Sequence, residues 1–151
     1  RQAEAWASET LRLAGEAQDT AGLARAYNAL GILARSRGDL ASAHEHLARG
    51  LALDNLASRV ALLNNLALTL RDLGDIPAAI HCTEEALALC AAQGDRHREA
   101  ALRNNLADLL HAAGQQDAAM TQLKLAVAVF AEIGQPAGAP EQPEIWKLVE
   151  W

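Results

Sequence analysis

Five asparagines recur at fixed places in a repeated block of this sequence, and their amides are the groups whose spacing best suits binding chemistry. Asn28, Asn64 and Asn104 lie 36 and then 40 residues apart, and Asn65 and Asn105 directly follow the last two. An asparagine amide both donates and accepts hydrogen bonds, so a row of them can pair with the backbone of an extended chain whatever its sequence. The same amides could instead cap loops or bridge neighbouring helices, and a structural role would recur equally. Both interpretations stay open.

Histidine and cysteine are spaced in ways that predict neither metal binding nor catalysis. His44 and His46 are two positions apart, so they face different sides of a helix. No serine or cysteine stands in a nucleophile motif, and no glycine-rich loop follows a strand to hold phosphate. Cys82 and Cys90 lie about 12 Å apart along one expected helix, too far for a disulfide. We therefore predict free thiols, no metal, no cofactor and no enzymatic activity.

The asparagines lie in a block that occurs three times, at residues 24–53, 60–89 and 100–129. In each copy apolar residues at helical spacing predict a first helix with one buried face. A glycine then follows, at a place where a left-handed residue ends a helix at little cost, and a second apolar helical pattern comes after it. These glycines are Gly38, Gly74 and Gly114. Each block is therefore expected to form a helical hairpin.

Blocks that recur at this spacing are typical of a helical array, so the predicted fold class is all-α. The first 18 residues match the second half of a block, which indicates a fragment of a longer protein. We expect an array over residues 1–133, made of a half repeat (1–18) and repeats at about 19–55, 56–94 and 95–133. The expected helices lie near residues 2–16, 20–37, 40–53, 57–73, 76–92, 96–113 and 116–133.

The end of the chain changes character. Residues 134–143 hold three prolines and two glycines, which cannot continue a helix and predict a linker. Residues 144–151 carry two of the three tryptophans and could form two turns of amphipathic helix. This helix either caps its own array or docks on a neighbouring molecule, and the open face of the first helix favours a dimer. The expected capping or self-association residues are Trp6, Ile145, Trp146, Leu148, Val149 and Trp151.

Charge and hydropathy exclude several classes of partner. The formal charge is -6 and the sequence pI is about 5.3, whereas nucleic acids and anionic membranes are bound by dense basic surfaces. No apolar run approaches the roughly 18 residues of a membrane span, and no secretory leader opens the chain. We expect a cytoplasmic protein with no nucleic-acid or membrane partner.

The block resembles the tetratricopeptide repeat (TPR) family over about residues 1–133. The matching features are a leucine followed by a small residue, the glycine seven residues on, and small residues in the second helix. The chain departs from the family's aromatic and proline positions. Its Asn-Asn-Leu-Ala motif and 40-residue spacing resemble the kinesin-light-chain-like subgroup, which is common at the C-terminal end of bacterial signalling ATPases and transcriptional regulators. The matching pairs are Leu30-Gly31, Leu66-Ala67 and Leu106-Ala107, and the small residues are Ala43, Ala79, Ala119, Gly50, Ala86 and Ala126.

The resemblance implies a right-handed α-solenoid whose first helices line a concave wall that holds extended peptides or partner helices. Arg35, Arg71 and His111 share one place on this wall, where they offer a basic floor to a carboxylate or are plain solvated surface. Asp108 interrupts an apolar patch there and could set specificity. The resulting candidates for peptide binding are Asn28, Asn64, Asn65, Asn104, Asn105, Arg35, Arg71, Asp108 and His111.

These features together predict a class of function and no reaction. We expect a non-catalytic protein–protein interaction module that binds a peptide or helix on its concave face, as a regulatory fragment of a larger bacterial signalling protein. Two alternatives remain: a self-assembly element of the parent protein, and a sensor of small ligands. Fold alone does not decide among them.

Overall fold

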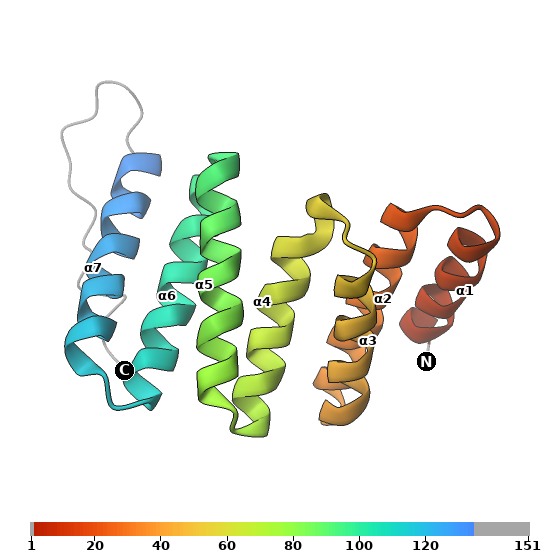
Figure 1. The fold of residues 1–151 in the computed structure, drawn as a ribbon, viewed down its shortest axis with the longest axis horizontal. Helices are drawn as coiled ribbons and strands as arrows, with labels where there is room; N and C mark the ends of the chain where they lie inside the picture. The colour runs from red at the N-terminus through yellow and green to blue at the C-terminus, as the bar shows by residue number, and fades with distance from the viewer. Residues whose placement is uncertain (1, 135–151) are drawn as a thin grey trace. The chain divides into compact units, whose positions relative to one another are not determined.

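The computed structural model describes residues 2–134, and all regular secondary structure in that range is α-helical (Figure 1). The expected linker lies, apart from Gly134, outside the described residues, as does the expected segment 144–151. Each helix begins and ends within one residue of its predicted bounds, which confirms the all-α prediction. The helices are α1 (Gln2–Glu16), α2 (Thr20–Ser36), α3 (Leu40–Ala52), α4 (Leu56–Leu73), α5 (Ile76–Gln93), α6 (Arg96–Ala112) and α7 (Gln116–Ile133).

The chain divides into two compact units, Arg1–Ala86 and Leu87–Trp151. The first unit holds α1 to α4 and most of α5, and the second holds the end of α5 with α6 and α7. Consecutive helices pack side by side as antiparallel pairs, as α2 with α3 and α6 with α7 show in Figure 1. In the first unit α4 also packs against both α2 and α3.

The ends of the helices follow from local side-chain chemistry. Asp39 illustrates the starts: its carboxylate accepts a hydrogen bond from the backbone N–H of Ser42 at 3.1 Å, and hydrogen bonds from Ser42 hold the pKa of Asp39 below its usual value. An N-terminal cap of this kind satisfies one of the backbone donors that a helix leaves unpaired. The turns between paired helices contain Gly38, Gly74 and Gly114 at φ of 78°, 87° and 78°. The predicted left-handed glycines are therefore confirmed.

Small residues bring the helices of the first unit close together. A Cβ atom added to Gly31 of α2 would lie 2.5 Å from Cγ of Leu47 in α3, and one added to Gly50 of α3 would lie 2.7 Å from Cδ2 of Leu62 in α4. Leu47 is completely buried. Glycine at these two places therefore lets α3 approach α2 on one side and α4 on the other.

Both cysteines are free thiols, as predicted. Cys82 is half-buried and Cys90 is buried, and burial raises the pKa of both thiols. A raised pKa keeps a thiol protonated near neutral pH, which makes it a poor nucleophile.

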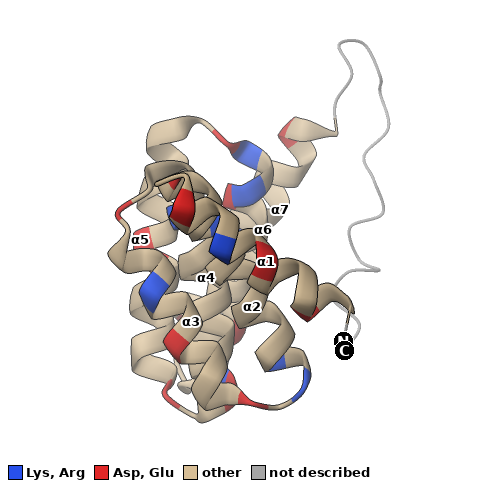
Figure 2. Ribbon diagram, turned by 90° about the vertical axis from the view of Figure 1, so that its right-hand side faces the viewer, with Lys and Arg blue, Asp and Glu red and all other residues tan. Residues whose placement is uncertain are grey.

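Charged residues of both signs are interspersed along the helices (Figure 2). Several arginines are paired with acids on the same or a neighbouring helix: Arg12 with Glu16 at 2.5 Å and Arg37 with Glu4 at 2.7 Å, for example. None of the described helices has the length and hydropathy needed to cross a membrane.

Candidate partner-binding face

The predicted asparagine row begins in the first unit, where two of its members bond to each other. The side-chain amide of Asn65 in α4 donates to Oδ1 of Asn28 in α2 at 2.9 Å. Both residues are half-buried, as is Asn64. For this pair the structure therefore shows the helix-bridging role that the sequence left open, since the amides tie α4 to α2.

A second polar pair joins the same two helices. Nε of Arg35 in α2 donates to Oδ2 of Asp72 in α4 at 2.7 Å. Nε of Arg71 lies 3.6 Å from the other carboxylate oxygen of Asp72. Arg35 and Arg71 were expected to offer a basic surface to a carboxylate ligand. Both have the carboxylate of Asp72 beside them. Asp72 was not predicted from the sequence, although it follows Arg71 just as Asn65 follows Asn64.

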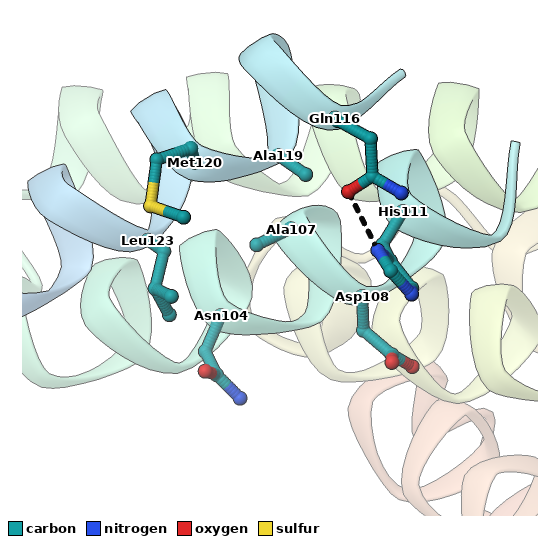
Figure 3. Close-up of a pocket in the computed structure, with 8 residues that line it drawn as sticks. All are labelled: Asn104, Ala107, Asp108, His111, Gln116, Ala119, Met120 and Leu123. Carbon is teal, nitrogen blue, oxygen red and sulfur yellow. Dashed lines mark hydrogen bonds between the residues drawn. The ribbon is translucent and has the colours of Figure 1, made fainter. Parts of the chain in front are cut away.

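The second unit holds a pocket of about 240 Å³ between α6 and α7 (Figure 3). Three predicted binding residues line it: Asn104, Asp108 and His111, which lie four and then three positions apart on one face of α6. Asn105, which is half-buried, is not among the lining residues. The structure therefore gathers part of the predicted set at one site. The full lining is Asn104, Ala107, Asp108, His111, Gln116, Ala119, Met120 and Leu123.

The pocket combines an apolar lining with polar groups at its edge. Met120 and Leu123 of α7 lie at one end, and the side chain of Met120 is 51% exposed. At the other end Nδ1 of His111 lies 2.8 Å from Oε1 of Gln116. In the neutral tautomer that donates from Nδ1 to this oxygen, Nε2 of His111 is an acceptor. A ligand that carries an apolar side chain next to a hydrogen-bond donor suits such a site.

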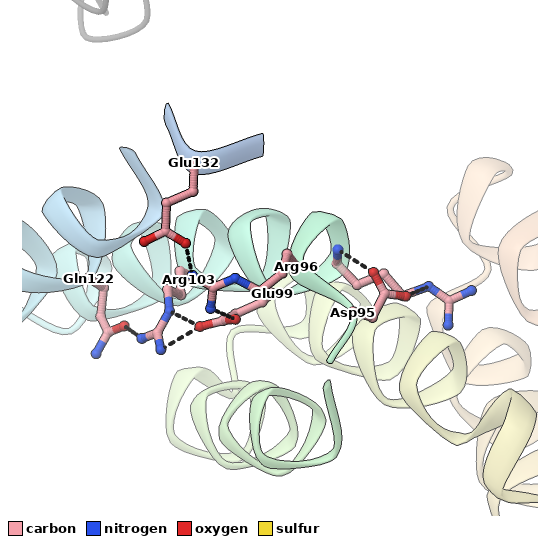
Figure 4. A network of polar contacts seen from close by, with 7 residues as sticks. Asp95, Arg96, Glu99, Arg103, Gln122 and Glu132 are labelled. Atoms are coloured by element: carbon pink, nitrogen blue, oxygen red, sulfur yellow. Dashed lines mark hydrogen bonds and ion pairs between the residues drawn. The ribbon is translucent and has the colours of Figure 1, made fainter. Parts of the chain in front are cut away.

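A buried carboxylate forms a second polar centre of the second unit (Figure 4). Glu99 is 6% exposed and accepts hydrogen bonds from Arg103 at 2.8 and 3.0 Å and from Arg96 at 2.6 Å. The hydrogen bond from Arg103, and secondarily the charge of Arg96, lower the pKa of Glu99. These arginines also reach α7, where Arg103 donates to Gln122 at 3.0 Å and Arg96 pairs with Glu132.

The Glu99 network joins α6 to α7 and was not foreseen in the sequence. A signal was present, because Arg96, Glu99 and Arg103 are three and then four residues apart and so share one face of a helix. Nothing about it suggests metal chemistry. Among residues 2–134, no cluster of three or more His, Cys, Asp or Glu side chains is arranged to hold a metal ion.

Paired antiparallel helices that repeat along the chain, with polar residues at matching places, define a helical repeat protein. A tetratricopeptide repeat family model matches residues 58–132, and a second model of that description matches residues 23–57. Together the two matches cover most of the chain without a gap. The chain belongs to the tetratricopeptide repeat family, as its sequence pattern predicted.

The fold is similar to that of a solved structure. The crystal structure of BtubC (BKLC) from P. vanneervenii matches with a TM-score of 0.73 and 20% sequence identity, over 87% of this chain and 56% of that one. This chain thus spans only about 56% of BtubC. At this identity the similarity shows the fold alone. No curated protein matches the sequence.

Proposed function

We propose that the chain is a non-catalytic protein-interaction module that binds a peptide or helix of a partner along the wall formed by its first helices. Tetratricopeptide repeats are typically non-catalytic and typically bind proteins, which supports the general class. The observation that carries the specific proposal is the α6–α7 pocket, where Asn104, Asp108 and His111 meet the apolar side chains of Met120 and Leu123. The other predicted residues, in α2 and α4 of the first unit and in α6 of the second, are further candidates for contact with a partner.

The proposed binding mode follows from the chemistry of the lining. An apolar side chain of the partner enters between Met120 and the His111–Gln116 pair, and its burial supplies affinity. Asn104 is an exposed residue. Its amide hydrogen-bonds to the partner's backbone, as does the imidazole of His111. Such contacts select an apolar anchor while tolerating many flanking sequences.

The wider setting is part of the same proposal. We place the chain in the cytoplasm, as a regulatory segment of a larger bacterial signalling protein. The support is the resemblance of its Asn-Asn-Leu-Ala motif, at residues 64–67 and 104–107, to the kinesin-light-chain-like repeats of such proteins. This support is an analogy of sequence pattern, since fold alone does not fix function.

Selection of phage-displayed random peptides on the immobilised full chain tests the binding site. Titration calorimetry with the selected peptides should show at least about tenfold weaker binding to Asn104→Ala/His111→Ala, a loss of about 1.4 kcal/mol. Lys124→Ala is the matched control, because Lys124 is an exposed residue of α7 outside the pocket lining. Equal affinity of the wild type and the folded double variant would reject the proposed site.

A self-assembly role is the second candidate, and one observation favours it. Trp6 and Leu13 of α1 are 74% and 51% exposed, so large apolar side chains of the first unit face solvent. Exposed apolar surface of this kind is typical of interaction sites. Sedimentation over a wide range of concentrations should then show a dimer that Trp6→Ser abolishes. A monomer at every concentration would contradict this role.

A further inference from the structure

The first unit holds a cavity of its own, of about 120 Å³, which we call the α1–α3 cavity because residues of α1, α2 and α3 line it. The α2 helix supplies an apolar wall that includes Leu30 and Leu33, and the turn after α2 supplies Arg37 and Asp39. A bound water occupies about 10–15 Å³ of such space. The cavity therefore has room for a small organic molecule.

One wall of the α1–α3 cavity carries a buried polar atom that the fold does not pair. His46 of α3 lines the cavity, and its Nδ1 atom is buried with no hydrogen-bond partner among residues 2–134. Leaving a buried polar atom unpaired is costly, so such atoms nearly always have a partner in folded proteins. The Nδ1 atom of His46 therefore indicates a ligand with a hydrogen-bonding group.

Two carboxylates and one guanidinium line the same cavity. Arg37 pairs with Glu4 of α1 at 2.7 Å, and its hydrogen bond lowers the pKa of Glu4. Hydrogen bonds from Ser42 lower the pKa of Asp39. Both acids therefore stay ionised at neutral pH. Because the two carboxylates outnumber the guanidinium, the lining is complementary to a cation.

The polar side chains at the start of α3 call for a ligand that donates hydrogen bonds. Asp39, Ser42 and His46 stand at i, i+3 and i+7, which places them along one face of the helix. An ionised carboxylate only accepts, and Nδ1 of a neutral imidazole accepts when the proton is on Nε2. An ammonium group has three donors and no acceptor, so it matches these neighbours.

We propose that the α1–α3 cavity binds the ammonium group of a small organic molecule. Its N–H groups donate to Nδ1 of His46 and to the carboxylate of Asp39, and its aliphatic carbons contact Leu30 and Leu33. This small-molecule site goes beyond the proposed partner binding and does not depend on it.

An NMR titration of the ¹⁵N-labelled full chain tests the site, with ethylamine hydrochloride as the probe. The backbone amide signals of Asp39, Ser42 and His46 and the imidazole ¹⁵N signals of His46 should shift and saturate. Sodium chloride at the same ionic strength and sodium acetate are the controls, and neither should produce saturable shifts. Glycine is the comparison ligand: tighter binding of glycine than of ethylamine would identify the ligand as an amino acid whose carboxylate meets Arg37, and the reverse order would identify a simple amine.

Two variants remove the proposed acceptors one at a time. Asp39→Asn keeps a cap on α3, because asparagine caps helices about as well as aspartate. It should weaken ethylamine binding at least about tenfold through the loss of a charge-assisted hydrogen bond. Asp75→Asn is the matched control, since Asp75 accepts from the backbone N–H of Ala78 at the start of α5 and does not line the cavity. His46→Phe removes the Nδ1 acceptor and should also weaken binding.

Three results would overturn the proposal. Shifts that never saturate, or that sodium chloride reproduces, would show that the cavity takes up water only. Saturable shifts with acetate and none with ethylamine would make it an anion site. Equal affinity of Asp39→Asn and Asp75→Asn for ethylamine would place the amine outside the α1–α3 cavity.

Discussion

The α2–α3 hairpin of the first unit and the α6–α7 hairpin of the second present matching repeat positions with different surroundings. On the first, α4 supplies an amide to Asn28 and a carboxylate to Arg35, and it packs against both helices of the hairpin. On the second, Asn104 is an exposed residue and His111 pairs with Gln116 of its own hairpin, at the edge of a pocket. The comparison teaches that one repeat position can bridge two helices in one unit and line a pocket in the other.

The two hairpins also differ in how their helices are held together. The first relies on close contact, with Gly31 of α2 against Leu47 of α3. The second has Ala107 at the place of Gly31, and it adds the buried Glu99 network that joins α6 to α7. A buried carboxylate is costly unless it is paired, so the second unit depends on its arginines in a way that the first does not.

The largest expected effect is that of Leu47→Ala, which tests whether the α2–α3 hairpin is fully buried at this position. Leu47 is completely buried, so its truncation should cost about 2–5 kcal/mol of unfolding free energy. Urea denaturation followed by circular dichroism measures the loss. Leu56→Ala, at a 64% exposed position of α4, is the control and should change stability by about 0.5 kcal/mol or less.

The same truncation in the second unit sharpens the comparison. Leu123→Ala should cost less unfolding free energy than Leu47→Ala. The reason is that Leu123 is only half-buried by α6 and α7. Equal losses at the two positions would mean that both faces are equally covered, and the contrast between the hairpins would not hold.

The next effect in size concerns the buried carboxylate of the second unit. Glu99→Gln removes the charge that Arg96 and Arg103 contact and should cost about 1–3 kcal/mol at pH 7. The half-exposed Arg35–Asp72 pair of the first unit is the comparison, and Asp72→Asn should cost about 0.2–1 kcal/mol. Urea denaturation at pH 7 measures both losses. An effect of Asp72→Asn as large as that of Glu99→Gln would contradict the difference in burial.

The pH dependence of stability separates Glu99 further. Because the arginines lower the pKa of Glu99 in the folded state, its contribution is present above the unfolded pKa of about 4.3 and is lost as the pH falls through the lower folded value. The wild type should therefore lose more stability than Glu99→Gln between about pH 5 and pH 3. Parallel stability curves for the two proteins would show that Glu99 does not titrate as its surroundings require.

The fold was predictable from the sequence because its determinants are local. Apolar residues at helical spacing and the left-handed glycines at Gly38, Gly74 and Gly114 locate the helices within one residue. The use of the asparagines was not predictable, because Asn28 accepts a hydrogen bond from Asn65, one position beyond Asn64, which holds the same repeat position as Asn28. That choice depends on the offset between α2 and α4, which neighbouring side chains set through packing.

The Glu99 network was missed for a related reason. The spacing of Arg96, Glu99 and Arg103 shows that they share a face of α6, but that pattern is equally typical of a solvated helix surface. Burial of Glu99, and the reach of the arginines to Gln122 and Glu132, depend on how α7 lies against α6. Three of the nine candidate binding residues line the pocket because they share one helix face. As binding residues, all nine candidates remain a prediction.

The smallest expected effects test the asparagines themselves. Asn65→Ala removes the donor to Asn28 and should cost about 0.5–1.5 kcal/mol, whereas Asn104→Ala, at an exposed position, should change stability by about 0.5 kcal/mol or less. Urea denaturation of Asn28→Ala, Asn65→Ala and the double variant gives the coupling between the two amides. A coupling of zero would remove the structural role of the pair, and the two hairpins would then offer equivalent asparagines for binding. A positive coupling, together with an Asn104→Ala variant as stable as the wild type, would show that asparagine stabilises the first unit but contributes little to the stability of the second.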